Sequence, residues 1–336
     1  MPRHLDSVEK IITRYFACLT KVPFSYRDDN YAPKPLIVSP LLLRGYLVLS
    51  VAAVAVLDSR LTICRLKTSQ WVKAYGKDCA TVPKVNSIGP HLRFAYYPKG
   101  EGDINLRRSC PERAKRAPAL LVSYVFLKRF LEHQDDYVYR DYMMDSGAYS
   151  VYRSGAEIDL EEYIDHCKLL AEIDPTLVEI IALDVIGSGE GSLKNAWTMK
   201  KAGVDAVPVF HFGEDFAILK EYCKHWSKVG LSCRFGESLK KSYWFYDQCF
   251  ARHWPKKFHS FGWTGDKMLM QYPFHSADTT SWRCGPSVFG RWKAFGGEHI
   301  PIRGQRDIGA EVEWWLDFEE RIQDHWKKEM LLLSSF

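Results

Sequence analysis

From residue 119 onward, short apolar runs alternate with longer segments of helical periodicity, and this alternation constrains the fold more than any other feature. Such a pattern is typical of βαβ units built around a parallel sheet. Eight runs are predicted to be strands: 119–123, 138–145, 178–184, 204–210, 228–232, 257–262, 272–278 and 299–303. Helices are predicted at 124–133, 159–173, 192–202, 214–226, 239–253 and 266–270.

Eight parallel strands favour an α/β fold of the closed (β/α)8 TIM-barrel type. The predicted barrel segment, 119–305, falls short of the roughly 200 residues at which this fold usually starts, so we expect a somewhat reduced barrel. An open doubly wound sheet is the alternative, but no G-x-G-x-x-G motif follows the first strand. The C-terminal segment, 306–336, contains a charged, Trp-bearing stretch that predicts a closing helix.

The charge of the chain is unevenly distributed. Residues 1–119 carry 20 Lys and Arg against 9 Asp and Glu, a balance of +11, whereas residues 120–336 carry 26 against 32, a balance of −6. We therefore predict a basic N-terminal region, 1–118, that binds nucleic acid, although a solvated linker would also be basic. Its densest positive stretch comprises Arg107, Arg108, Arg113, Lys115 and Arg116.

The nine cysteines are scattered, with no CxxC pair and no other metal-ligand spacing. This predicts reduced thiols, a cytoplasmic location and no metal cofactor. The first residues lack the layout of a signal peptide. The apolar run 41–57 has only 17 residues and includes Arg44, whereas a spanning helix needs about 20 apolar residues, so we expect a buried element and no membrane partner.

Polar residues stand at the ends of several predicted strands. Asp145, Asp184 and Asp278 each end an apolar run, and His211 follows another. The carboxyl ends of parallel strands meet on one face of a barrel, where catalytic groups lie. Burying a carboxylate is unfavourable unless it is paired or used, so three of them predict a functional site. Taken alone, Asp145 could equally cap a following helix.

Five motifs carry a family resemblance that covers about 119–285. They are MDSGAYSVY (144–152), ALDVIG (182–187), VPVFHFGED (207–215), VGLS (229–232) and FHSFGWTG…YPFHSADTTSW (258–282). Together they resemble the tRNA-guanine transglycosylase superfamily, and most of all its branch of 7-deazaguanine DNA transglycosylases, with which phages and bacteria modify their DNA. The resemblance implies a pentosyltransferase that replaces guanine in DNA with a free 7-deazaguanine base.

The resemblance also implies residue roles. Asp278 would be the nucleophile that attacks C1′ and holds the sugar as an ester, and Asp145 the general acid/base. Implied contacts to the base come from Asp184, His211, Gly230 and Leu231. The chemistry agrees, because base displacement through an oxocarbenium-like state calls for one nucleophilic and one proton-transferring carboxylate. The target base must be flipped out of a duplex or lie in single-stranded DNA, and the candidate stacking faces are Tyr149, Tyr152, Phe210 and Phe212.

Two departures from the family pattern affect the expected substrate. The tRNA enzymes hold zinc with CxCxxC and a distant His, whereas here Cys284 and His299 alone follow Asp278 as plausible ligands, so we expect no zinc. The family's Gly-Phe-Gln is replaced by Ala148-Tyr149-Ser150. The missing zinc ligands count against tRNA as the substrate. Three alternatives to the DNA transglycosylase stay open: a DNA glycosylase in which water resolves the intermediate and leaves an abasic site, a tRNA transglycosylase, and a non-catalytic nucleic-acid-binding protein.

Overall fold

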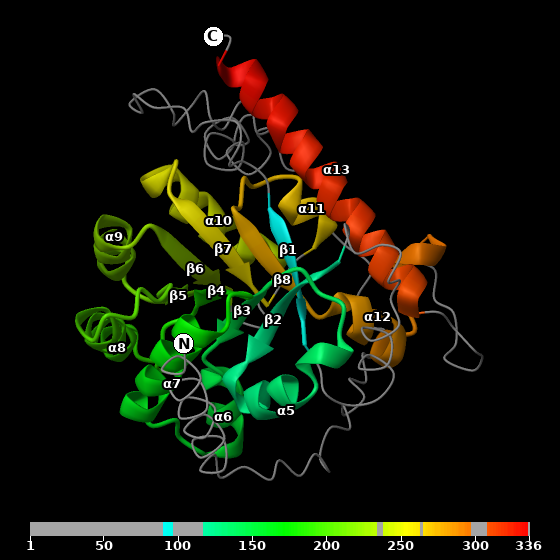
Figure 1. Cartoon of the computed structure of the whole chain (residues 1–336). Helices are drawn as coiled ribbons and strands as arrows, with labels where there is room; N and C mark the ends of the chain where they lie inside the picture. Colours follow the sequence, from blue (N-terminus) through cyan, green and yellow to red (C-terminus); the bar gives the residue numbers. More distant parts are fainter. Residues whose placement is uncertain (1–89, 97–116, 234–237, 263–264, 297–307, 335–336) are drawn as a thin grey trace, which may run out of the picture. The chain divides into compact units, whose positions relative to one another are not determined.

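Eight parallel strands form a single sheet in the computed structural model of the protein (Figure 1). The structure describes residues 90–96, 117–233, 238–262, 265–296 and 308–334. The chain divides into two units, Met1–Leu66 and Lys67–Phe336, and every described residue belongs to the second. The predicted buried element at 41–57 and the basic stretch at 107–116 lie outside the described residues.

The strands succeed one another around the sheet in chain order. They are β1 His91–Ala95, β2 Ala119–Ser123, β3 Tyr142–Asp145, β4 Leu177–Ile180, β5 Val209–His211, β6 Lys228–Ser232, β7 Lys257–Phe261 and β8 Ser276–Thr279. The order in the sheet is β4-β3-β2-β1-β8-β7-β6-β5, and a parallel bridge between Ile181 and Val207 connects the two ends. The predicted α/β class is confirmed, and the all-parallel curled sheet fits a TIM-like barrel.

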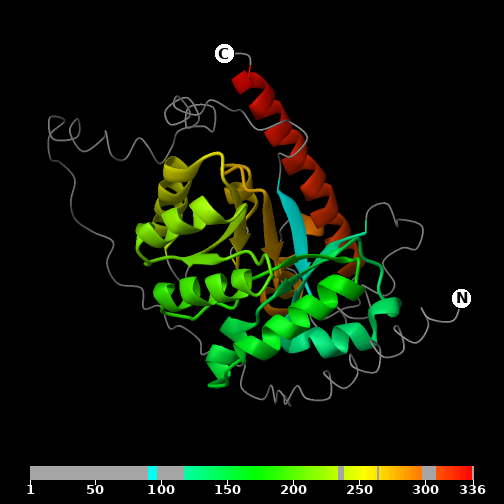
Figure 2. The same ribbon diagram turned by 60° about the vertical axis from the view of Figure 1, so that its left-hand side comes forward.

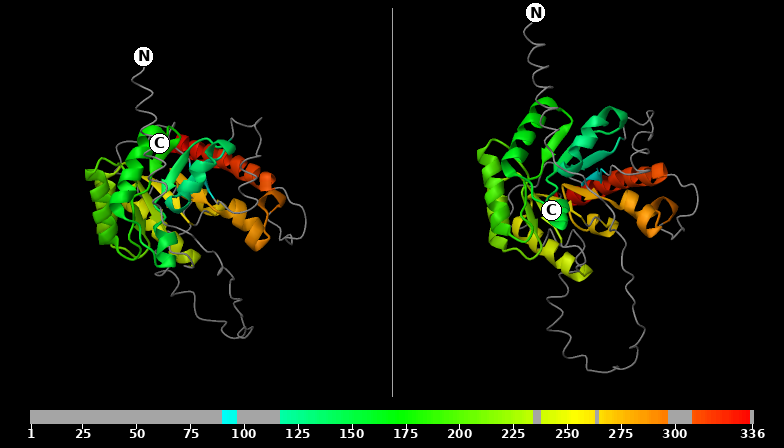
Figure 3. Two further views of the ribbon diagram at one scale, coloured as in Figure 1. Left: turned by 60° about the horizontal axis from the view of Figure 1, so that its bottom comes forward. Right: turned by 90° about the horizontal axis from the view of Figure 1, so that it is seen from below.

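Helices lie outside the curled sheet (Figures 2 and 3). They are α5 Leu127–Glu132, α6 Ala148–Ser154, α7 Leu160–Ile173, α8 Gly189–Lys201, α9 Phe216–His225, α10 Leu239–His253, α11 Asp266–Leu269, α12 Ser281–Phe289 and α13 Ile308–Ser334. Short 3-10 turns occur at Tyr124–Phe126, Gln134–Asp136 and Lys293–Phe295. No helix in the described ranges is long and apolar enough to cross a membrane.

Polar side chains start several of these helices. Asp159 caps α7 by accepting a hydrogen bond from the Glu162 N–H, as its position before the helical pattern predicts. Ser188, Asp215 and Ser238 cap α8, α9 and α10 in the same way. Because these caps fix where each helix begins, they also fix the lengths of the loops that follow the strands.

Charged side chains meet inside the curl of the sheet. Arg93 of β1 donates to Asp141 at 2.6 Å and lies 3.8 Å from Glu179 of β4, which Lys228 of β6 contacts at 2.6 and 2.7 Å. Strands β1, β4 and β6 are not neighbours in the sheet, so these contacts cross its interior. Branched apolar residues usually fill this position in such barrels. The charges are tolerated here because each has an opposite partner.

Helix α13 is attached to the first strand. Its Glu319, 5% exposed, accepts a hydrogen bond from the Leu92 N–H at 3.0 Å and lies 3.5 Å from Arg140 Nη2. Further along the helix, Trp326 Nε1 donates to the Leu269 carbonyl at 2.8 Å. The predicted closing helix in 306–336 is therefore present, with its buried side against β1 and the segment before β8.

The structure corrects the start of the predicted barrel. Strand β1, His91–Ala95, pairs with β2 and β8 in the middle of the sheet, although it lies in the region 1–118 that was predicted to precede the barrel. The run HLRFA lacks the apolar pattern of a buried strand because Arg93 stands among its apolar residues. In the folded protein this arginine contacts Asp141 and Glu179. The strand predicted at 299–303 lies outside the described residues.

Candidate active site at the carboxyl ends of the strands

Three carboxylates gather at one end of the sheet. Asp145 is the last residue of β3, Asp184 follows β4, and Asp278 lies near the end of β8. In addition to burial, the charges of both Asp184 and Asp278 act on Asp145 and raise its pKa. The predicted convergence of the strand ends is therefore present in the structure, although β8 and β4 are well separated in the sheet order.

Asp145 is fixed by the turn that follows it. Its Oδ2 accepts a hydrogen bond from the Gly147 N–H at 3.1 Å. Gly147 has φ +77°, and a Cβ there would lie 2.8 Å from Val125 Cγ2, so both conformation and space require glycine. Burial and then the charge of Asp184 raise the pKa of Asp145 to about 7. Helix α6 starts at Ala148, its N-cap residue is Gly147, and no side chain caps it, so the helix-cap interpretation of Asp145 is wrong.

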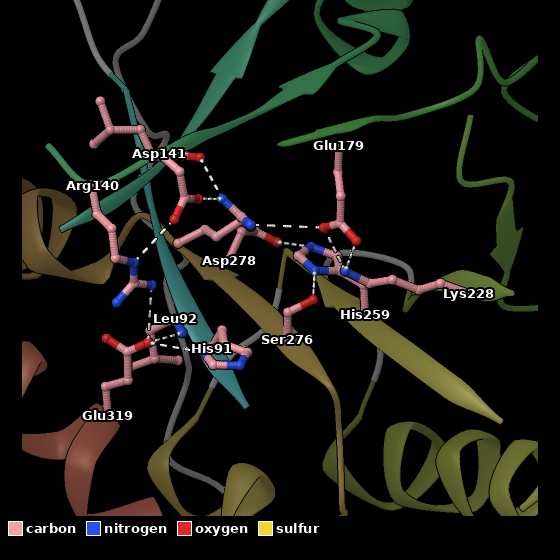
Figure 4. Close-up of polar contacts among 12 residues, drawn as sticks. His91, Leu92, Arg140, Asp141, Glu179, Lys228, His259, Ser276, Asp278 and Glu319 are labelled. Carbon is pink, nitrogen blue, oxygen red and sulfur yellow. Dashed lines mark hydrogen bonds and ion pairs between the residues drawn. The ribbon is translucent and has the colours of Figure 1, made fainter. Parts of the chain in front are cut away.

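Asp278 is the more deeply buried of the two candidate catalytic carboxylates. It is 5% exposed, and its Oδ1 accepts a hydrogen bond from the Gly262 N–H at 3.0 Å. Burial raises the pKa of Asp278 to about 6, although this hydrogen bond acts in the opposite direction. The imidazole of His259 lies beside it, with Nε2 3.8 Å from Oδ1 (Figure 4).

Asp184, His211 and Glu214 form a row of three side chains in contact with one another. Asp184 Oδ2 lies 3.0 Å from His211 Nε2, and His211 Nδ1 lies 3.2 Å from Glu214 Oε1. Burial opposes a charge on the imidazole, but the hydrogen bonds to Asp184 and Glu214 outweigh it and raise the pKa of His211 to about 9. A hydrogen bond from the Ser146 hydroxyl to Asp184 Oδ1, at 3.0 Å, completes the arrangement.

The contacts of His211 with these two carboxylates change its expected role. Both ring nitrogens already contact carboxylates, so the side chain orients Asp184 instead of offering a free donor to a base. Glu214 and Ser146 were not predicted as site residues. The H-x-x-E spacing in HFGED could have pointed to Glu214, because the turn after β5 places its carboxylate against both the His211 N–H and its ring.

Phe210 was predicted to stack on a base, and this prediction is wrong. Its side chain is fully buried and stacks against Phe245, with Phe216 at an angle on another side. In a β-strand successive side chains point to opposite faces, so Phe210 points away from the face that His211 uses. Phe212 is partly buried and packs edge-on against Trp244 and Phe245.

Tyr149 and Tyr152 of α6 are exposed, at 56% and 63%, and can still offer aromatic faces to a ligand. Gly230 and Leu231 are buried in β6. The Gly230 N–H donates to the Pro208 carbonyl at 2.8 Å, so the predicted backbone contact to a base is not supported for this group. What Gly230 provides instead is room, because a Cβ there would lie 2.5 Å from the Phe261 ring.

Predicted binding and metal-ligating residues outside the carboxylate cluster lie partly beyond the described ranges. The basic residues Arg107 to Arg116 and the candidate zinc ligand His299 fall there, whereas Cys284 is described as a free, partly buried thiol in α12. Within the described ranges, no group of three or more His, Cys, Asp or Glu side chains is arranged to hold a metal ion.

The chain matches no protein-family model, and no curated protein matches it significantly. The resemblance to the transglycosylase superfamily therefore rests on the five motifs alone. The structure contributes an arrangement that can be judged by its chemistry: two carboxyl groups whose pKa values are raised by burial, a third carboxylate in contact with the His211 imidazole, and a barrel face on which all three meet.

Proposed function

We propose that this protein is a DNA base-exchange enzyme, a pentosyltransferase that replaces guanine in DNA with a 7-deazaguanine. The observation that carries the proposal is the meeting of Asp145, Asp184 and Asp278 at the carboxyl ends of β3, β4 and β8. Paired carboxyl groups with separated pKa values are what a displacement at an anomeric carbon requires. Carboxyl groups whose pKa values are raised by burial and by neighbouring carboxylates are characteristic of functional sites.

In the first half of the reaction, a carboxylate oxygen of Asp278 attacks C1′ of a flipped-out deoxyguanosine. The bond from C1′ to the base nitrogen breaks, and its electron pair leaves with the base. Asp145, in its protonated form, gives its proton to the departing guanine. The products of this step are free guanine, an Asp145 carboxylate and an ester between Asp278 and the deoxyribose.

The second half reverses these events with a different base. The ring nitrogen of a free 7-deazaguanine attacks C1′, the ester bond breaks, and Asp278 is released as a carboxylate. Asp145 takes up the proton that the incoming nitrogen loses. The enzyme thus returns to its starting protonation state without a cofactor, and the DNA strand keeps its continuity.

The pKa values favour this division of roles. Burial raises the pKa of both groups, and the negative charges of Asp184 and Asp278 raise the pKa of Asp145 further. A proton held by this pair is therefore favoured on Asp145, the acid, which leaves Asp278 ionised as the nucleophile. Asp184 is held by His211 and Ser146, which suits a carboxylate that accepts hydrogen bonds from the N–H groups of a guanine-like base.

The proposal is tested by incubating the protein with duplex and single-stranded DNA and isotope-labelled guanine or a labelled 7-deazaguanine. Label entering the DNA, and its loss in the Asp278→Asn variant, is the expected result. Release of a base with abasic sites left behind would indicate the hydrolytic glycosylase instead. Exchange into tRNA but not DNA would overturn the assignment of DNA as substrate, and no exchange or release with any nucleic acid would overturn the enzyme assignment.

A further inference from the structure

His259 of β7 is buried directly behind Asp278. The side chain has no exposed surface, and its Nδ1 lies 2.7 Å from the Ser276 hydroxyl oxygen. Its other nitrogen, Nε2, has no hydrogen-bond partner among the described residues and lies 3.8 Å from Asp278 Oδ1. Figure 4 shows the ring between Ser276 and Asp278. A buried polar atom without a partner is rare in a folded protein, and this one faces the candidate nucleophile.

The surroundings of the ring decide its protonation state. Burial, and then the positive charges of Lys228 and Arg93, lower the pKa of His259 well below its usual value, against the opposing charge of Glu179. The imidazole is therefore neutral and carries one N–H. With the hydrogen on Nδ1, the lone pair of Nε2 would face the Asp278 carboxylate. With the hydrogen on Nε2, the N–H faces the carboxylate and Ser276 donates to Nδ1, which is the more favourable arrangement.

We propose that His259 is a positioning residue for Asp278, with Ser276 fixing the tautomer that points the Nε2–H at Asp278 Oδ1. The inference rests on the proposed function, because it assigns the role in relation to the attack of Asp278 on C1′. Oδ1 already accepts a hydrogen bond from the Gly262 N–H at 3.0 Å, and the imidazole N–H is a further donor that limits the rotation of the carboxylate once the two groups approach.

A separation of 3.8 Å is too long for a hydrogen bond in the free protein. Contacts of this kind shorten when a substrate closes an active site. In the covalent intermediate Oδ1 belongs to an ester, and it regains negative charge as the incoming base displaces Asp278. The Nε2–H stabilises that charge in the transition state, so its removal should lower kcat more than it raises KM.

Two substitutions at His259 distinguish the effect of losing the N–H donor from the effect of losing the imidazole ring. His259→Gln places an amide N–H near the position of Nε2, whereas His259→Leu fills similar space without a donor. We expect kcat for exchange to fall at least tenfold in the Leu variant, with KM changed by less than threefold, and to recover in part in the Gln variant. Equal losses in both variants, or a loss confined to KM, would overturn the positioning role.

A second readout does not depend on nucleic-acid chemistry. The carboxyl carbon of Asp278 can be followed by NMR during a pH titration of protein labelled with ¹³C-aspartate, with Asp278→Asn identifying the signal. Charged groups near this site also include Asp145, Glu179, Lys228 and Arg93, and the Leu and Gln variants keep all of them. We expect the apparent pKa of Asp278 to rise in His259→Leu and to move less in His259→Gln.

The two readouts distinguish failure of this inference from failure of the proposed function. If the wild-type protein exchanges no base but the titration still responds to His259→Leu, the proposed function fails and the contact survives. An Asp278 titration that is identical in wild type and His259→Leu would refute the contact whatever the activity. If His259→Leu does not fold, Ser276→Ala replaces it: its expected effect is a smaller rise in the pKa of Asp278, and an unchanged titration contradicts the tautomer assignment.

Discussion

At the scale of single residues, the proposed reaction depends on two carboxyl groups that keep their protons to unusually high pH. Burial is the first cause for both Asp145 and Asp278, and the charge of Asp184 adds to it at Asp145. Because the groups interact, their titrations belong to the pair, and kinetics will report two apparent values instead of two assigned ones. This coupling leads to two predictions.

The first prediction concerns the pH dependence of base exchange. Activity requires Asp278 ionised and Asp145 protonated, so kcat/KM should rise as pH increases through about 6 and fall as it increases beyond about 7. Single-turnover rates measured between pH 4.5 and 9 test this. The Asp145→Asn variant, which cannot donate a carboxyl proton, should be slow and should lose the alkaline limb. A rate that climbs steadily to pH 9 would contradict the assigned roles.

The second prediction concerns folding stability. The folded-state pKa of Asp145, about 7, lies above the ordinary value of 3.8, so the folded protein binds more protons than the unfolded chain between pH 4 and 7. Stability therefore falls as pH rises through this window. Asp145→Asn should raise the free energy of unfolding at pH 8 by roughly 2–4 kcal/mol and have little effect at pH 4.5.

Urea denaturation at the two pH values measures this difference. Asp165→Asn on the exposed side of α7 is a matched control and should change stability at neither pH. A stabilisation by Asp145→Asn of equal size at pH 4.5 and 8 would mean that the ionised carboxylate is not the cause. Stabilisation gained at the expense of activity is expected where a site is organised for chemistry and not for folding.

At the scale of elements, the packing of β6 against β7 depends on a glycine. Gly230 lies opposite Val209 and His259 in the sheet, and its missing side chain leaves room for the Phe261 ring. Gly230→Ala should destabilise the protein by about 1–3 kcal/mol, because the Cβ would overlap that ring. Gly265→Ala is the control: its φ is −78°, and apart from its chain neighbours no described residue has an atom within 4 Å of a Cβ there.

Equilibrium unfolding in urea distinguishes the two glycine variants. The expected result is a lower unfolding midpoint for Gly230→Ala and an unchanged or slightly higher one for Gly265→Ala. If both variants kept the wild-type midpoint, Phe261 would have to move at no cost in stability, and Gly230 would not be required for packing.

Elements with plain apolar or helical periodicity could be predicted from the sequence, and others could not. The capped helix α7 and the apolar strands β2 and β3 were predicted close to their observed positions. Strand β1 was missed because Arg93 interrupts it, and that arginine is stabilised only by Asp141 and Glu179, which lie far away in sequence. The local sequence pattern around Arg93 cannot show which distant carboxylates will lie next to it, because only the folded sheet brings them together.

The same distinction applies to the site. Asp145, Asp184 and Asp278 were predictable because each carboxylate ends an apolar run. The prediction for Phe210 is wrong because an aromatic residue near a strand end can point to either face of the sheet. The side chain of Phe210 points into the core and stacks on Phe245. His259 gave no signal at all, since its role depends on the distance to Asp278 across two neighbouring strands.

At the scale of the whole molecule, the uneven charge of the chain is predicted to bring DNA to the barrel. Neutralising Arg107, Arg108, Arg113 and Lys115 together should weaken DNA binding and reduce the dependence of log K on log salt by about 0.9 for each phosphate that these side chains neutralise. Fluorescence anisotropy between 50 and 300 mM salt measures this slope. Lys327→Gln with Lys328→Gln, on an exposed part of α13, is the control. An unchanged slope in the quadruple variant would exclude the basic stretch from the interface.

The proposed reaction passes through a covalent bond between Asp278 and the deoxyribose of DNA. Without a free acceptor base the intermediate should accumulate, so rapid acid quenching of the protein mixed with DNA, followed by nuclease and protease digestion, should yield a peptide containing Asp278 that carries a sugar. Mass spectrometry identifies the modified residue. The account predicts this adduct on Asp278 in the wild-type protein, its disappearance when free guanine is added, and no adduct in Asp278→Asn. An adduct on another residue, or base release from DNA by Asp278→Asn at the wild-type rate, would contradict the account.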